Sequence, residues 1–123
     1  ETLGYLKDAH LNLGIVTDGN AIRQAKKLNA LHLSSFFDCV IYTDLLKKPK
    51  PSPVPFQYIL KELATSPSCA VHLGDNPLID FKGSKAIGMK TTRLMKGEFR
   101  YLPSDDDIDI EILEFSDLIE VIF

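Results

Sequence analysis

The sequence feature that most constrains the fold is the segment 71–89, which reads VHLGDNPLIDFKGSKAIGM. It begins with a short apolar run typical of a buried strand, breaks at Gly74, and resumes as a helix-forming run that ends at Gly88. Asp75 lies in the break, and Asp80 lies at the start of the second run. A strand that ends in a carboxylate and continues into a helix is typical of an α/β domain, in which ligands bind beyond the carboxyl ends of the strands.

The acidic residues of this turn have two interpretations. Two carboxylates indicate a hard cation, because Mg²⁺ takes oxygen ligands and is usually held by only one or two protein carboxylates. The alternative is structural, since the tetrapeptide at 74–77, Gly-Asp-Asn-Pro, is also a favourable turn that can cap a helix. These residues alone leave both interpretations open, and the rest of the chain has to decide between them.

Strand-like and helix-like runs alternate along the whole chain. Strands are predicted at 11–16, 39–42, 69–73, 89–94 and 108–113, and helices at 1–10, 21–30, 56–64, 78–87 and 117–121. The predicted cap of the second helix is Asn20, and its predicted apolar face is Ile22, Ala25, Leu28 and Leu31. Such alternation predicts one Rossmann-like, three-layer α/β domain over residues 1–123, with a mostly parallel sheet and helices on both faces.

Composition and charge exclude several classes of protein. The net charge of -3 gives no electrostatic reason to expect nucleic acid or an anionic membrane as a partner. No apolar run has the length of a membrane span, and the first residues lack the pattern of a secretion signal. Cys39 and Cys69 match neither a zinc motif nor a disulfide framework, so we expect buried free thiols in a reducing cytoplasm.

Residues suited to phosphate chemistry follow three of the predicted strands. They are Thr17 and Asp18 after the first, Lys47, Lys48 and Lys50 in a proline-rich loop after the second, and Asp75 and Asp80 after the third. A hydroxyl and free backbone N–H groups can hold phosphate oxygens, a lysine can neutralise phosphate charge, and an aspartate can hold Mg²⁺. Each residue alone has an ordinary structural explanation, but their position at successive strand ends indicates a phosphate and magnesium site.

Three motifs made of these residues resemble those of the haloacid dehalogenase-like hydrolases, most of which are magnesium-dependent phosphatases. The segment 13–20, LGIVTDGN, resembles the second family motif; 50–56, KPSPVPF, resembles the third; and 74–89 resembles the fourth. Lys50 rather than Lys48 has the family's spacing to the phenylalanine of the third motif. The motifs stand in family order across nearly the whole chain, and the chain is most similar to the phosphoglycolate phosphatase group.

The resemblance implies a role for each matching residue. Thr17 would hydrogen-bond the substrate phosphoryl group, helped by the backbone N–H of Asp18. Lys50 would stabilise negative charge on the nucleophile and on the phosphoryl group. Asp75 would bind Mg²⁺, and Asp80 would orient Lys50 or hold a metal-bound water.

The family's first motif, Asp-x-Asp at the end of an apolar strand, has no counterpart in the chain. In the family its first aspartate attacks phosphorus to form an aspartyl-phosphate, and its second is the general acid and base. The only Asp-x-Asp patterns begin at Asp105 and Asp107, in or after a polar loop that follows the fourth motif. We therefore expect an incomplete core without the nucleophile strand and without the cap domain, inactive or very weak alone.

Loss of a central strand would expose two strand edges and apolar surface. We therefore expect the chain to form a homodimer or to pair with an N-terminal complementing segment. The leading functional hypothesis is a cytoplasmic, magnesium-dependent phosphatase that acts on a small phosphomonoester. A signalling receiver-like domain fits less well, because its acidic, threonine and lysine residues come in another order. A non-catalytic regulatory or interaction module that retains the fold is the main alternative, and the missing first motif favours it.

Overall fold

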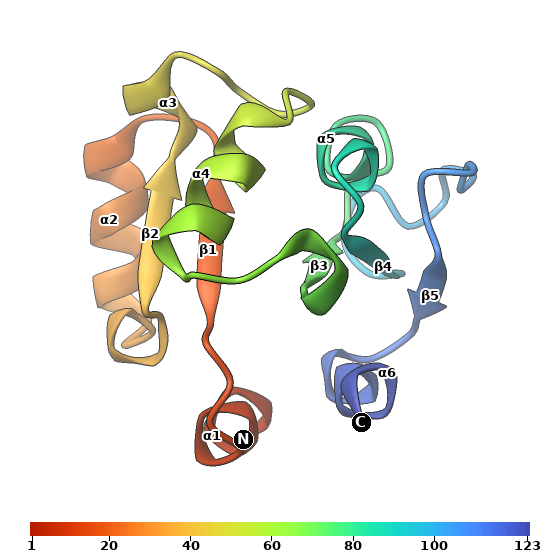
Figure 1. Cartoon of the computed structure of the whole chain (residues 1–123), viewed down its shortest axis with the longest axis horizontal. Helices are drawn as coiled ribbons and strands as arrows, with labels where there is room; N and C mark the ends of the chain where they lie inside the picture. Colours follow the sequence, from red (N-terminus) through yellow and green to blue (C-terminus); the bar gives the residue numbers. More distant parts are fainter.

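The computed structural model describes residues 1–123, along which helices and strands alternate as the sequence predicts (Figure 1). The strands are β1 (Gly14–Thr17), β2 (Cys39–Tyr42), β3 (Val71–Gly74), β4 (Lys90–Leu94) and β5 (Ile110–Ile112). The α-helices are α1 (Thr2–Asp8), α2 (Ala21–Ala30), α3 (Thr43–Leu46), α4 (Val54–Glu62), α5 (Phe81–Ala86) and α6 (Leu118–Ile122). Short 3-10 turns are η1 (Ser34–Phe36), η2 (Pro67–Cys69) and η3 (Phe115–Asp117).

The strands form two parallel sheets rather than one. In the first, β1 pairs with β2, and Ile15 lies opposite Val40. In the second, β4 pairs with β3 on one side and with β5 on the other. One edge of β1 and one edge of β3 therefore have no strand partner. The parallel α/β architecture expected from the sequence is confirmed, and its sheet is interrupted between β1 and β3, as in an incomplete Rossmann-like core.

Helix α4 packs against both sheets and joins them on one face. Its Phe56 and Leu60 form a buried cluster with Met89, which follows α5. Val16 of β1 and Ala70 beside β3 pack against the same cluster. The two sheets share no ladder of hydrogen bonds, so burial of apolar side chains under this helix holds them together on this side.

Helices α1 and α6 pack on the opposite face. Leu6 of α1 and Leu118 of α6 form a second buried cluster with Ile112 of β5. Val71 and Leu73, which point to the same side of β3, pack against it. The two clusters lie on opposite faces of the strands, and the predicted arrangement of three layers is confirmed.

Helix α2 differs from its prediction in burial rather than in extent. It spans the predicted residues, and the side chain of Asn20 caps it by accepting the N–H of Arg23 at 3.0 Å. Only half of its predicted apolar face is covered, because Ala25 and Leu28 are partly buried whereas Ile22 is 69% exposed and Leu31 is 57% exposed. Leu31 is exposed because it lines a pocket beside β1, which has no strand partner on one edge.

Three other predictions are corrected by local geometry. Helix α5 begins at Phe81 rather than 78, because Asn76 closes a preceding turn by accepting the N–H of Leu78 on its side chain. Cys69 is exposed in a 3-10 turn and is not a buried strand residue, since the strand starts only at 71. The last helix begins at Leu118 rather than at 117, after a 3-10 turn with a capping box of Glu114 and Asp117.

None of the helices combines the length and the hydrophobicity that crossing a membrane requires.

Candidate functional site

The parallel strands bring the predicted site residues to one edge of the molecule. Thr17 is the last residue of β1, and Asp75 directly follows β3. Lys50 lies in the loop between α3 and α4, which follows β2. Because the carboxyl ends of parallel strands meet at the same edge, residues far apart in the sequence become neighbours here.

Lys50 and Asp80 form a shielded ion pair at the centre of this edge. Lys50 Nζ lies 2.8 Å from Asp80 Oδ1, and the two side chains are 14% and 7% exposed. The other carboxylate oxygen, Oδ2, accepts the backbone N–H of Asp75 at 3.1 Å and of Asn76 at 2.8 Å. Asp80 therefore holds the lysine ammonium with one oxygen and the Asp75 turn with the other.

Two glycines make this close approach sterically feasible. A methyl group added at Gly74 would lie 2.7 Å from Asp80 Oδ2. One added at Gly83 in α5 would lie 2.6 Å from the carbonyl oxygens of Pro51 and Ser52, in the loop that carries the lysine. Since real Cβ atoms do not approach so closely, only glycine lets these segments meet. The sequence gives no sign of this close packing at either glycine, because it depends on distances that only the folded chain sets.

Asp18 links the end of β1 to the lysine loop through its side chain. Its Oδ1 accepts the hydroxyl of Thr43 at 2.6 Å and the backbone N–H of Lys50 at 3.2 Å. Thr43 is 1% exposed, so this contact is buried from solvent at one end. The resemblance implies a role only for the backbone N–H of Asp18. Thr43 was not among the predicted site residues, although its position directly after a predicted strand was an available signal.

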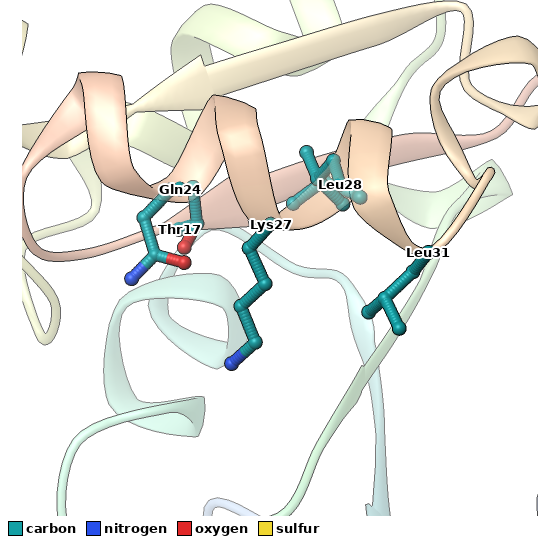
Figure 2. Close-up of a pocket in the computed structure, with 6 residues that line it drawn as sticks. Thr17, Gln24, Lys27, Leu28 and Leu31 are labelled. Atoms are coloured by element: carbon teal, nitrogen blue, oxygen red, sulfur yellow. The ribbon is translucent and has the colours of Figure 1, made fainter.

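Thr17 faces a small pocket between β1 and α2 (Figure 2). The pocket has a volume of about 180 Å³ and is lined by Ile15, Thr17, Gln24, Lys27, Leu28 and Leu31. The hydroxyl of Thr17 donates to the carbonyl of Asp18 at 3.3 Å. Polar side chains gather near Thr17, and leucines form the other end.

Asp75 has the carboxylate that is available for a cation. It is exposed, and no hydrogen bond or ion pair occupies its side chain, whereas Asp80 is fully engaged. No group of three or more histidine, cysteine, aspartate or glutamate side chains is placed to hold a metal. Mg²⁺ keeps several waters and accepts one protein carboxylate, so the residues fit a weak, one-carboxylate magnesium site.

His72 lies beside the ion pair in an apolar setting. Its Nδ1 is 2.7 Å from Ser84 Oγ, and its ring centroid lies 4.7 Å from that of Phe56 and 5.4 Å from that of Phe81. Desolvation lowers the pKa of His72 from 6.5 to about 4; the nearby Lys50 charge also lowers it, while the Asp80 charge opposes the shift. His72 is therefore a neutral histidine, hydrogen-bonded to Ser84 and packed between two aromatic rings.

The lowered pKa of His72 predicts acid sensitivity in a defined range. Above pH 6.5 the histidine is neutral in both states, and the folded state carries no penalty. Between pH 6.5 and about 4 the unfolded chain gains a proton that the folded protein does not, so the free energy of unfolding should fall by up to about 3 kcal/mol. Urea unfolding at pH 7 and pH 4.5 measures this. The difference in the free energy of unfolding between the two pH values should be smaller in His72→Asn. An equal difference in that variant would show that His72 is not the cause of the acid sensitivity.

The second Asp-x-Asp pattern lies away from this site. Asp109 directly precedes β5, so it stands at the amino end of the parallel strands. Its carboxylate pairs with Lys85 Nζ and accepts the N–H of Thr91 at 2.9 Å. The hydrogen bond from Lys85 is the main cause of its lowered pKa. Asp109 therefore fastens β4 to the start of β5, which agrees with its exclusion as a nucleophile.

An incomplete parallel α/β core with these three motifs is typical of the haloacid dehalogenase-like hydrolases, and comparison with known proteins supports this assignment. Residues 1–94 match the family model described as haloacid dehalogenase-like hydrolase, so the chain belongs to this family.

Individual relatives within the family are phosphatases. The chain is 34% identical over 122 residues to the glyceraldehyde 3-phosphate phosphatase of Methanocaldococcus jannaschii, a match that covers 99% of this chain and 54% of the relative. It is 35% identical over 126 residues to the pyrophosphatase PpaX of Bacillus velezensis, covering 98% and 56% respectively. The crystal structure of a HAD phosphatase from Thermococcus onnurineus superposes with a TM-score of 0.87 at 33% identity, over 98% of this chain and 54% of that one. The chain thus spans about half the length of the relatives that it matches.

Proposed function

We propose that this chain forms the phosphoryl-binding and cation-binding part of a magnesium-dependent phosphatase that acts on a small phosphomonoester. The observation that carries the proposal is the hydrogen-bonded connection between strand ends: Asp18 holds the Lys50 backbone, and Asp80 holds both the Lys50 ammonium and the Asp75 turn. A cation, a hydroxyl and a free carboxylate at one edge suit a phosphate ester and its metal.

Each residue would act on the phosphoryl group in its own way. The Thr17 hydroxyl and the backbone N–H of Asp18 would donate to its oxygens, and the Lys50 ammonium would neutralise its charge. Asp75 would hold Mg²⁺, which when bound supplies charge neutralisation at the phosphoryl oxygens. Asp80 would hold the lysine in place by pairing with Nζ.

The attacking aspartate would come from an extended segment that pairs with both free strand edges. β1 and β3 each lack a partner on one side, and both are parallel to their remaining neighbours. The pocket beside β1, with Ile15, Leu28 and Leu31 on its wall, offers apolar surface for the side chains of such a strand. An N-terminal complementing segment fits this place best, and a second copy of the chain is the other candidate. Without either, the aspartyl-phosphate cannot form, and the chain alone would be inactive.

Hydrolysis of p-nitrophenyl phosphate tests this function. The purified chain should release no p-nitrophenol, with or without Mg²⁺. The chain joined to the part of the Methanocaldococcus jannaschii relative that it does not match should be active. That activity should require Mg²⁺ and should be lost in Asp75→Asn, because the free carboxylate is its only acidic cation ligand from this chain.

Two outcomes would contradict the proposal. A joined protein that is folded yet inactive would favour a non-catalytic module that retains the fold. Activity that survives Asp75→Asn would remove the proposed cation ligand. Sedimentation of the purified chain distinguishes the two ways of covering the free edges, since a second copy would give a dimer and an absent segment would leave a monomer.

A further inference from the structure

Arg93 is a fully buried charged residue that the proposed chemistry does not use. It lies on β4 with 0% of its surface exposed. Its Nη1 donates to Ser104 Oγ at 2.7 Å, and its Nη2 donates to the carbonyl of Phe99 at 3.0 Å. Ser104 in turn donates to a carboxylate oxygen of Glu111 at 2.5 Å, so its hydroxyl links the guanidinium to a carboxylate. A buried guanidinium is costly unless it is hydrogen-bonded, which indicates that these two contacts matter.

Both acceptors of Arg93 belong to the loop that follows β4. The carbonyl of Phe99 lies inside a tight turn from Gly97 to Arg100. That turn is closed by the backbone N–H of Arg100, which donates to the carbonyl of Gly97 at 3.3 Å, and by its guanidinium, which donates to the same oxygen at 2.7 Å. By holding the Phe99 carbonyl, Arg93 holds this turn as a unit.

The same turn lies beside the candidate cation ligand. Gly97 adopts φ +82°, a left-handed conformation that favours glycine, and a Cβ built on it would lie 3.5 Å from Asp75 Oδ2. The backbone at Gly97 therefore lies close to the Asp75 carboxylate, with room for about one methyl group between them. The side chain of Asp75 makes no hydrogen bond, so the nearby backbone of Gly97 limits where its oxygens can lie.

We propose that Arg93 is a positioning residue that holds the Gly97–Arg100 turn against Asp75 and so orients the carboxylate for a divalent cation. The inference rests on the proposed function only in giving Asp75 that ligand role. Arg93 itself is shielded from solvent, and its guanidinium hydrogen-bonds Ser104 and Phe99 rather than Asp75. A lysine in its place would keep the charge but could not donate in two directions from a planar group.

The test compares the whole chain with Arg93→Lys by two readouts. The first is the nuclear Overhauser effect between Gly97 Hα and Asp75 Hβ, measured without metal. The second is the dissociation constant of Mn²⁺, used as the probe cation, from water proton relaxation. Arg93→Lys should lose the first signal and weaken Mn²⁺ binding roughly tenfold, as for other residues that orient metal ligands. Ser104→Ala removes one of the two hydrogen-bond acceptors of Arg93. It should weaken the Overhauser effect and Mn²⁺ binding by less than Arg93→Lys does.

Lys96→Ala is the matched control in the same loop, because its exposed side chain pairs only with Glu114. It should leave both readouts unchanged. A folded Arg93→Lys variant that keeps the Overhauser effect and the wild-type Mn²⁺ affinity would overturn the inference. If Arg93→Lys does not fold, an unchanged Overhauser effect and an unchanged Mn²⁺ affinity in Ser104→Ala would overturn the inference. Wild-type Mn²⁺ affinity in Asp75→Asn would instead refute the proposed cation site, while the metal-free Overhauser effect would still decide the role of Arg93.

Discussion

Replacing Asp80 with alanine should lower the free energy of unfolding by about 3–5 kcal/mol, because it leaves the Lys50 ammonium unpaired in a shielded site. The ammonium is 2.8 Å from the carboxylate, and the lysine side chain is only 14% exposed. The substitution also removes the acceptor for the backbone N–H groups of Asp75 and Asn76. Urea unfolding followed by circular dichroism measures the loss.

A double-mutant cycle and a surface control make this prediction specific. Lys50→Met combined with Asp80→Ala should cost less than the sum of the two single changes, since no charge is left unpaired. Lys96→Ala removes an exposed ion pair, in which the lysine side chain is 51% exposed, and should cost no more than about 1 kcal/mol. Additive losses at Lys50 and Asp80 would show that the pair does not form in solution.

Replacing Phe56 with alanine should also cost about 3–5 kcal/mol, because it removes a large side chain from a fully packed position. Phe56 is 1% exposed and packs with Leu60 and Met89 under the helix that joins the two sheets. The cavity would weaken that junction, and no ladder of hydrogen bonds between β1 and β3 can compensate. The measurement is again the free energy of unfolding in urea.

Phe115 provides the matched control for Phe56. It is 36% exposed and belongs to neither buried cluster, so Phe115→Ala should cost much less. The Phe56 variant should also show a smaller loss of stability on acidification, since its His72 ring would be better hydrated. Equal costs for the two phenylalanines would contradict the bridging role assigned to α4.

Local features of the sequence were sufficient for most of the secondary structure. The limits of α2 and β2 agree with their prediction, because a cap residue, helical periodicity and a short apolar run are all local signals. The start of α5 was wrong, since a side-chain hydrogen bond of Asn76 keeps the preceding residues in a turn. The exposure of Cys69 was also missed, because the limits of a strand are less well determined than its presence.

For the candidate site, the sequence was sufficient to choose the residues but not to establish their roles. Its residues Thr17, Lys50, Asp75 and Asp80 could be chosen from motif spacing and strand order, and the absence of a first motif pointed to an interrupted sheet. The roles of those residues toward phosphate and Mg²⁺ remain predictions, which the experiments above address.

What the sequence determined by itself is the alternation of strands and helices and the order of the motifs, because both depend on residues close together in the chain. The tertiary structure alone decided that Asp18 binds Thr43, that Gly83 admits the lysine loop, and that Arg93 reaches Phe99 and Ser104. These are contacts between separate segments, and their distances are set by how helices and sheets pack. The pKa of His72 belongs with them, since desolvation between two aromatic rings from different helices has no signature in the sequence.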